Sequence, residues 1–348
     1  DAALFLDGMP VVDNHGVPAG GSFFGIGKVE QIGTADLEAG REYAVEVRMK
    51  RPPSQNALSG LNLGAFPPTL TDPVAEAVDV AAAADLAIVI VGTNDDWESE
   101  GYDRDTMDLP GRQDELIAAV AQACPHTVVV VNAGSPVSMP WLDAVDAVVY
   151  TWFPGQEMGD ALVDVLLGDI EPQGRLPVSF PVGLQDTPAF EHHPGRNGVA
   201  SYLEGRLIGY RWYDTIGRHP LFPFGFGLGY ADVTIAAARI GADSVQPPSV
   251  DVDVVNGSGR DGVQVVQIYA GHTGVTERRG DEPAQQLVGF AKVGVPAQGT
   301  TTVTVQLDPR AMHTWSVSEH AWERAEGPFE LRVGTSSRDI AVRIPIAD

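Results

Sequence analysis

Residues 86–134 read LAIVIVGTNDDWESEGYDRDTMDLPGRQDELIAAVAQACPHTVVVVNAG, and this stretch decides the class of fold. It opens with a continuous apolar run over 86–92 and closes with a second run over 126–134. Between the two runs, residues 111–124 are mostly good helix formers. Continuous apolar strands that alternate with helices are typical of a parallel sheet covered on both faces. The stretch therefore predicts an α/β domain.

The same alternation continues on both sides of this stretch. Residues 72–85 are expected to form a helix, because Asp72 suits an N-cap and Pro73 suits the first helical position. Further on we expect a short helical patch over 139–144, a strand over 146–153 and a helix over 156–169. We assign 66–230 to one α/β sandwich with a mostly parallel sheet. Functional groups in such sheets gather at the loops after the strands, here 93–111, 132–136 and 152–157.

Both ends of the chain show the two-residue alternation of β-strands. A hairpin that turns at Asp7–Gly8 and a strand over 41–51 indicate a partial β-domain over 1–65, with too few strands for a stable sheet alone. The region 231–348 is predicted to be a β-sandwich of the fibronectin type III or immunoglobulin kind. Its expected strands lie at 250–256, 263–270, 286–293, 301–307, 329–336 and 340–346.

Charge and cysteine content limit the partners and the chemistry. The 348 residues carry a formal net charge of −25. Nucleic acids and anionic membrane surfaces attract basic patches, so neither is expected as a partner. No apolar run reaches the roughly 18 residues of a membrane span. The single cysteine, Cys124, cannot form an internal disulfide and is expected to be a buried thiol.

The chain begins with Asp1 and shows neither an initiator Met nor a signal peptide. We therefore expect an internal start. The localisation is unknown from such a sequence, and both a cytoplasmic and a secreted protein stay open.

The loop after the first apolar strand carries seven carboxylic acids within 95–108. A solvated, charged loop is the simplest interpretation. The spacing of Asp96, Glu98 and Glu100 resembles the opening of an EF-hand calcium loop, but the twelfth position is Met107 in place of Glu. We therefore expect no metal site. The glycine motifs that hold phosphates do not follow these strands, so no cofactor is expected either.

A third interpretation is that one of these acids donates a proton. Aromatic residues and like charges surround Glu98 and Glu100, and both kinds of neighbour favour the protonated form of a carboxyl group. At a strand end such a group can face a cleft. Glycosidases need a proton donor of this kind, with a second carboxylate on the other side of the sugar. Spacing alone does not choose between the two glutamates.

Three segments resemble the C-terminal α/β-sandwich domain of family 3 glycoside hydrolases, a family that includes β-glucosidases. They are ESEGYDRDTMDLPGRQDELIAAVAQACPHTVVVVNAGSPVSMPW, TWFPGQEMGDALVDVLLGDIEPQGRLPVSFP and EGRLIGYRWYDTIGRHPLFPFGFGLGY. Their order and spacing also match the family over 72–230. The remainder, to Asp348, resembles the fibronectin-III-like domain that ends many members. The N-terminal part resembles the second half of a PA14 domain, which some members carry inserted into the α/β sandwich.

The resemblance implies a retaining hydrolase whose general acid/base lies on the acidic loop. The most similar members place it in a W-E-x-E-G-Y-D-R stretch, just before the Gly-Tyr pair, which corresponds to Glu100; Glu98 is the reserve candidate. Trp97, Tyr102 and Arg104 become candidates for the substrate cleft. The family's nucleophile is an Asp on an N-terminal TIM-like barrel that these residues do not include. This chain by itself is therefore expected to be inactive or nearly so.

We therefore expect the C-terminal part of a retaining β-glycosidase, with β-glucosidase preferred, which acts on terminal β-linked sugars of oligosaccharides or glycosides. Its partner would be the missing barrel domain. The alternative is a non-catalytic carbohydrate-binding or scaffolding fragment. A nucleotide-binding α/β protein is a third option. The sugar, the linkage and the oligomeric state, including a homo-oligomer, stay open.

Overall fold

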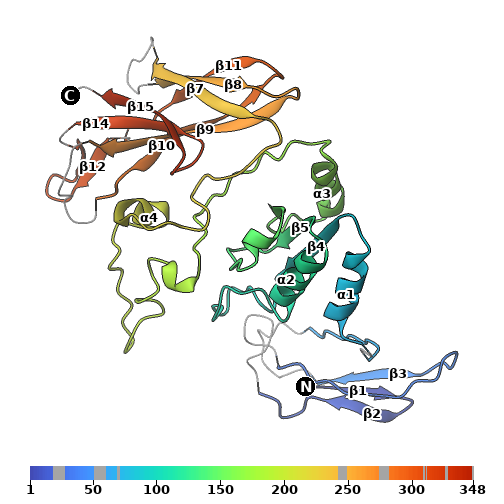
Figure 1. The fold of residues 1–348 in the computed structure, drawn as a ribbon. Coiled ribbons are helices and arrows are strands. Elements are labelled where there is room, and N and C mark those ends of the chain that lie inside the picture. Colours follow the sequence, from blue (N-terminus) through green and yellow to red (C-terminus); the bar gives the residue numbers. More distant parts are fainter. Residues whose placement is uncertain are drawn as a thin grey trace. The chain divides into compact units, whose positions relative to one another are not determined.

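Figure 1 shows the computed structural model of the chain. The structure describes residues 1–18, 28–50, 60–68, 71–241, 249–273, 282–308, 310, 312–325 and 328–346. Two compact units make up the chain, Asp1–Phe153 and Pro154–Asp348.

The N-terminal segment forms a three-stranded antiparallel sheet in the order β2-β1-β3. Its strands are β1 (Ala2–Leu6), β2 (Met9–Asp13) and β3 (Val45–Met49). The predicted hairpin is confirmed, because Asp7 and Gly8 both have the positive φ that its tight turn requires. The strand expected over 41–51 is shorter, and all five residues of β3 are exposed.

The rest of the first unit contains a parallel sheet in the order β4-β5-β6. Its elements are α1 (Pro73–Ala82), β4 (Ala87–Gly92), α2 (Gln113–Ala123), β5 (Thr127–Asn132), a short 3₁₀ helix (Leu142–Ala144) and β6 (Ala147–Tyr150). Helix α2 packs on β4 and β5, and α1 packs against α2 (Figure 1). The residues Val129, Val130 and Val131 are completely buried, which explains why their continuous apolar run forms the central strand.

The helices and strands expected over 72–153 are confirmed. Asp72 caps α1, because its side chain accepts a hydrogen bond from the amide of Val74 at 3.1 Å, and Pro73 occupies the first turn. Cys124 is buried as expected, and its thiol contacts the carbonyl oxygen of His126 at 3.4 Å.

The second unit begins with α3 (Met158–Leu167), which ends where Gly168 adopts the left-handed conformation. A loop-rich segment with a 3₁₀ helix (Leu184–Asp186) leads to α4 (Tyr210–Ile216). The remainder is the expected β-sandwich, whose two sheets have the orders β10-β9-β14-β15 and β11-β8-β7. The strands are β7 (Val233–Ile240), β8 (Ser249–Asn256), β9 (Gly262–His272), β10 (Gln286–Val295), β11 (Thr300–Gln306), β14 (Phe329–Gly334) and β15 (Ile340–Ile346). Alternate residues of these strands form one hydrophobic core.

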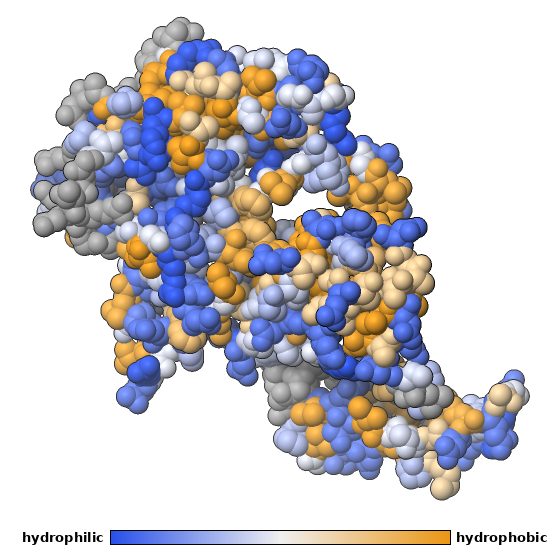
Figure 2. Space-filling model, viewed as in Figure 1, coloured by the Kyte–Doolittle hydropathy of each residue, from blue (hydrophilic) through white to orange (hydrophobic). Residues whose placement is uncertain are grey.

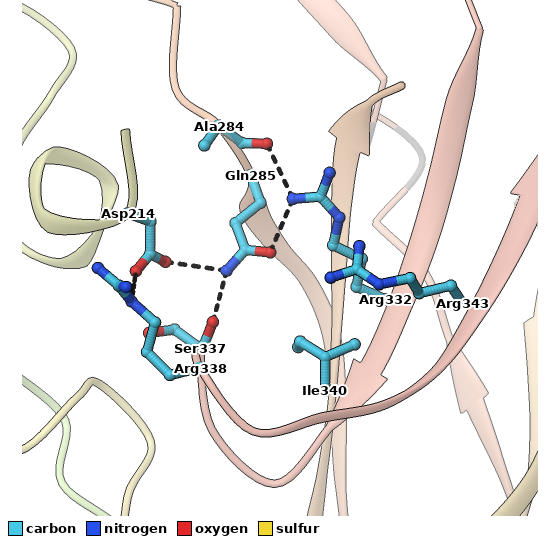
Figure 3. Close-up of a pocket in the computed structure, with 8 residues that line it drawn as sticks. All are labelled: Asp214, Ala284, Gln285, Arg332, Ser337, Arg338, Ile340 and Arg343. Atoms are coloured by element: carbon cyan, nitrogen blue, oxygen red, sulfur yellow. Dashed lines mark hydrogen bonds and ion pairs between the residues drawn. The ribbon is translucent and has the colours of Figure 1, made fainter. Parts of the chain in front are cut away.

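A buried polar network ties α4 to the sandwich (Figure 3). The carboxylate of Asp214, which is 5% exposed, accepts hydrogen bonds from Arg338 and from the amide of Gln285, the latter at 2.9 Å. Arg338 also donates to the carbonyl oxygens of Tyr213 and Arg218 at 2.9 and 2.8 Å. Helix α4 and the sandwich therefore belong to one packed unit.

Two strand predictions were incomplete. Strand β7 was not expected, because its alanines give it a weak β-propensity; it pairs at the edge of its sheet with β8, whose neighbour on the other side is β11. Pro177 excludes a central strand from the described segment 174–181 and favours the end of an edge strand there, but the segment forms only an isolated bridge, between Phe180 and Phe222.

The large apolar rings of Trp315 and Trp322 in the last domain predict packing in its core, and the structure departs from this prediction. Trp315 and Trp322 face each other across a hairpin of β12 (His313–Ser316) and β13 (Ala321–Arg324), with ring centroids 5.7 Å apart. They are 49% and 45% exposed. A two-stranded hairpin has no second layer, so its aromatic pair shields itself edge to face while both rings stay accessible.

The face of the molecule in Figure 2 carries both hydrophilic and hydrophobic residues. Figure 2 shows polar residues spread over the face in view, with smaller hydrophobic groups among them, as the large negative charge leads one to expect. In the described ranges, no helix combines the length and apolar character needed to cross a membrane.

Candidate active site

The acidic loop lies at the carboxyl-terminal edge of the parallel sheet. Strand β4 ends at Gly92, which is in register with Asn132 at the end of β5, and Val131 is in register with Tyr150 at the end of β6. Residues 93–111, 133–140 and 151–153 therefore leave the sheet at one edge. This is the edge at which α/β sheets assemble binding and catalytic groups.

The end of β4 is held by a side chain of α2. The amide group of Gln113 donates to the carbonyl oxygen of Gly92 at 2.9 Å and accepts from its N–H at 2.7 Å. Gly92 also approaches β5 closely, since a Cβ atom there would lie 2.0 Å from the carbonyl oxygen of Asn132. The starting point of the acidic loop is thus fixed by two neighbouring elements.

The loop first forms a tight turn around Asn94. The carbonyl oxygen of Asn94 accepts hydrogen bonds from the amides of Trp97 and Glu98 at 2.9 and 2.8 Å, and its side chain accepts from the amide of Asp96 at 3.1 Å. Asn favours such turns because its side chain can bond to the backbone two residues on. The turn directs the side chain of Glu98 back toward the sheet.

Glu98 is the partly buried carboxylate of this loop, with its side chain 15% exposed, whereas the other acids of 95–108 are exposed. Its oxygens accept hydrogen bonds from the hydroxyl of Thr93 at 2.6 Å, the amide of Gly134 at 3.0 Å and the hydroxyl of Ser135 at 3.0 Å. The guanidinium of Arg104 lies 4.0 Å away, an ion pair at its outer limit and not a hydrogen bond. Glu98 therefore joins the loop after β4 to the loop after β5.

Glu100 lies two residues later in a contrasting environment. Ser99 and Tyr102 form an isolated antiparallel bridge, so Glu100 and Gly101 occupy the tip of a tight turn. The amide of Gly101 donates to the hydroxyl of Ser99 at 3.1 Å, which closes the turn. Glu100 is exposed, and within the described ranges its carboxyl group has no hydrogen-bond or ion-pair partner. The structure thus presents one glutamate to solvent and holds the other in place.

The three residues proposed to line a cleft make contacts within the site. The hydroxyl of Tyr102 donates to the carbonyl oxygen of Asp96, which braces the turn that carries Glu100. Arg104 donates to the carbonyl oxygen of Pro136 at 2.9 Å. Trp97 is half-buried, and among the described residues its indole N–H has no hydrogen-bond partner. Tyr102 and Arg104 therefore anchor the loop in this structure.

The sequence located the loop after β6 but not the roles of its residues. The hydroxyl of Tyr150 donates to the carbonyl oxygen of Ser135 at 2.6 Å. Burial, followed by the negative charge of Glu98, raises the pKa of Tyr150, so this tyrosine is a neutral hydrogen-bond donor. Trp152 has φ of +55° and packs edge to face on Tyr150 at 5.0 Å. Positive φ at a bulky residue stores strain and occurs often at functional sites, but it has no sequence signature.

No metal centre is evident in the part of the chain that the structure describes, where no three His, Cys, Asp or Glu side chains are grouped to hold an ion.

Comparison with known proteins gives this geometry a family. Residues 18–230 match the Glycosyl hydrolase family 3 C-terminal domain, and residues 264–337 match the Fibronectin type III-like domain. A β-glucosidase of Rhizobium radiobacter is 40% identical over 99% of this chain and 43% of its own length. β-Glucosidase B of Emericella nidulans is 42% identical over 89% of this chain and 39% of its own length.

Solved structures agree with these sequence matches. The β-glucosidase of Kluyveromyces marxianus in complex with glucose has a TM-score of 0.88, with 33% identity over all of this chain and 42% of that protein. DesR, a β-glucosidase of Streptomyces venezuelae in complex with D-glucose, has a TM-score of 0.72, with 38% identity over 78% of this chain and 35% of that protein. The chain thus spans about two fifths of the relatives that it matches. It belongs to glycosyl hydrolase family 3 and contains the C-terminal α/β domain of that family and a fibronectin type III-like domain.

Proposed function

We propose that this chain is the C-terminal part of a retaining β-glucosidase and that Glu100 is its general acid/base. The observation that carries the proposal is the contrast between the two glutamates. Glu98 is enclosed by three hydrogen-bond donors, whereas Glu100 is exposed at the tip of a braced turn. A proton donor must reach the leaving oxygen of a substrate, and an exposed carboxyl group at a sheet edge is suited to that task.

The proposed reaction has two steps in which Glu100 changes role. In the first step, the Glu100 carboxyl group gives its proton to the glycosidic oxygen while a nucleophilic carboxylate attacks the anomeric carbon, and the aglycone leaves as an alcohol. In the second step, the Glu100 carboxylate takes a proton from water, which attacks the same carbon and releases the sugar and the nucleophile. Each step ends with one proton transferred, and the anomeric configuration is retained.

The nucleophile is assigned to a barrel domain elsewhere in the full-length polypeptide. A retaining pair faces each other across the sugar at about 5–5.5 Å. Neighbouring acids such as Asp95, Asp96 and Asp103 share one loop with Glu100, so they are poor candidates for the opposite face. Two of the relatives with solved structures were obtained in complex with glucose, which supports glucose as the sugar. The partial β-sheet of 1–65 is proposed to be the second half of a PA14 domain.

The proposal is tested with Glu100→Gln in the full-length polypeptide. Turnover of β-glucosides with poor leaving groups should fall about 10²–10⁴-fold, because the leaving alcohol is no longer protonated. Dinitrophenyl β-glucoside, whose leaving group needs little protonation, should lose much less in its first step. The basic limb of the pH–rate profile should disappear.

Asp105→Asn is the matched control, since Asp105 is an exposed acid of the same loop. It should leave turnover within about twofold of the parent protein. Unchanged turnover in Glu100→Gln would reject the acid/base role and would favour a non-catalytic carbohydrate-binding part.

A further inference from the structure

We infer that Glu98 is a positioning residue whose ionised carboxylate holds the acid/base turn at the sheet edge, an inference that rests on the proposed role of Glu100. It removes Glu98 from the candidates for proton donor. Glu98 acts on the reaction only through the place that it gives to Glu100, and it does not touch substrate.

The first argument is the occupancy of the carboxylate. One oxygen of Glu98 accepts from the Thr93 hydroxyl and the Gly134 amide, and the other accepts from the Ser135 hydroxyl. All three groups donate toward it, and hydrogen bonds to a carboxylate are shorter and stronger than those between neutral groups. The guanidinium of Arg104 adds a weak attraction from 4.0 Å. A group held in this way is a fixed negative anchor.

The second argument is that the neighbouring loop is shaped to receive this carboxylate. A Cβ atom at position 134 would lie 2.7 Å from the Glu98 carboxylate and 2.6 Å from the ring of Phe153. Glycine at position 134 is therefore required for close approach and not for an unusual backbone angle. Thr93, which donates from the other side, is itself 9% exposed. The anchor is thus built from both strand ends.

The third argument is the short path from the anchor to the turn. A single residue, Ser99, separates Glu98 from Glu100. The Ser99–Tyr102 bridge and the hydrogen bond from the Tyr102 hydroxyl to Asp96 brace the other side of the turn. The tip that carries Glu100 is therefore restrained at both ends. Loss of the Glu98 anchor removes the side-chain hydrogen bonds that hold the near end of this turn to the loop after β5.

The test begins with the 348-residue chain. Glu98→Gln exchanges the charge for an amide of nearly the same shape, which can accept only on one side. Amide hydrogen exchange over 99–102 should become roughly tenfold faster or more, because the loop opens without its charge-assisted bonds. Asp105→Asn should leave exchange over 99–102 as in the parent chain. Unchanged exchange in Glu98→Gln would overturn the anchor.

In the full-length polypeptide, Glu98→Gln should lower kcat by roughly up to 10²-fold with little change in KM, since a misplaced acid affects the transition state more than binding. The loss should be larger for poor leaving groups than for dinitrophenyl β-glucoside. A merely structural defect would reduce turnover of the substrates with poor leaving groups and of dinitrophenyl β-glucoside by the same factor. That result would overturn the inference. The basic limb of the pH–rate profile should remain, because Glu100 is still present as the proton donor. Its disappearance would identify Glu98 as the proton donor and would also overturn the inference.

Thr93→Val keeps the proposal testable if Glu98→Gln does not fold. It removes one of the three hydrogen bonds with little change in volume, so the same selective loss should follow at smaller size. Results with Glu100→Gln separate the two proposals. If Glu100→Gln keeps full turnover, the proposed function is wrong. The hydrogen-exchange experiment on Glu98→Gln still tests whether Glu98 holds the turn. If Glu100→Gln loses turnover and Glu98→Gln changes nothing, only the anchor fails.

Discussion

Glu98 and Glu100 have the same side chain and differ in what surrounds them. Glu98 is enclosed by donors from two strand ends, whereas Glu100 is exposed on a turn. Enzymes commonly give two nearby carboxyl groups separate roles by such a difference in environment. Here the difference separates the residue proposed to move a proton from the residue proposed to hold it in place.

A close approach between strands makes Gly92 sensitive to substitution. In Gly92→Ala the new Cβ would meet the backbone of Asn132 at 2.0 Å, so β4 and β5 must separate. We expect the free energy of opening of the β4 and β5 amides to fall by about 1–3 kcal/mol in hydrogen exchange. Gly64→Ala is the control, because no atom lies within 4 Å of its added Cβ. Equal protection in both variants would show that the sheet adjusts without cost.

At the scale of elements, the site depends on how strand ends are held and not on the strands alone. Gln113 at the start of α2 pins the end of β4, and the Tyr150 hydroxyl at the end of β6 holds the loop after β5. Each connection joins an element to the loop of its neighbour. The result is a loop cluster whose backbone is fixed although most of its acids are exposed.

In the second unit, Asp214 gives the contact between α4 and the sandwich a pH dependence. Burial raises the pKa of Asp214 above its ordinary 3.8, and the hydrogen bond from Gln285 and the charge of Arg338 offset only part of this effect. A folded-state pKa above the unfolded value means that protonation stabilises the fold. This contribution to the free energy of unfolding is fully present below pH 3.8, the ordinary pKa of Asp. It is lost as the pH rises through the raised pKa of Asp214 in the folded state.

Asp214→Asn should therefore reveal the sign of this contribution. Asn does not titrate, so the free energy of unfolding of the parent protein should improve relative to the variant as the pH falls from 7 toward 3.8. Urea denaturation of both proteins across this range measures the difference. A free energy of unfolding of the parent protein that falls relative to that of Asp214→Asn as the pH falls would contradict the raised pKa.

At the scale of the whole molecule, this chain corresponds to 43% and 39% of two curated β-glucosidases. The family's retaining mechanism needs two carboxyl groups on opposite sides of the sugar. The loop after β4 supplies the candidate for one side only. The proposed active site is thus assembled from this chain and a domain outside it.

The 348 residues expressed alone should therefore release little or no nitrophenol from an aryl β-glucoside, whereas the full-length polypeptide should release it readily. Adding the separately expressed remainder of the polypeptide should restore part of the activity if the two parts associate. Strong hydrolysis by the isolated chain would place both catalytic carboxyl groups within these residues. It would reject the proposal that the nucleophile lies in a domain outside them.

The sequence predicted the helices and strands of 72–153 well, because apolar runs, an N-cap at Asp72 and helix-forming residues act locally. It also located the acidic loop at a strand end. It missed β7, whose alanines carry little signal, and it placed Trp315 and Trp322 in a core that their hairpin does not provide. In both cases the outcome depends on which layers pack against a strand. A local sequence pattern carries no information about that packing.

The sequence by itself determined that two glutamates follow an apolar strand in an α/β domain, since hydrophobic periodicity and chain order are sufficient for that. Only the tertiary structure decided which glutamate is enclosed. Two of the donors to Glu98, Gly134 and Ser135, lie 36 and 37 residues away along the chain. They meet Glu98 because parallel strands end at one edge of the sheet. A long-range hydrogen bond of this kind has no periodicity, so the sequence could name both acids but not separate them.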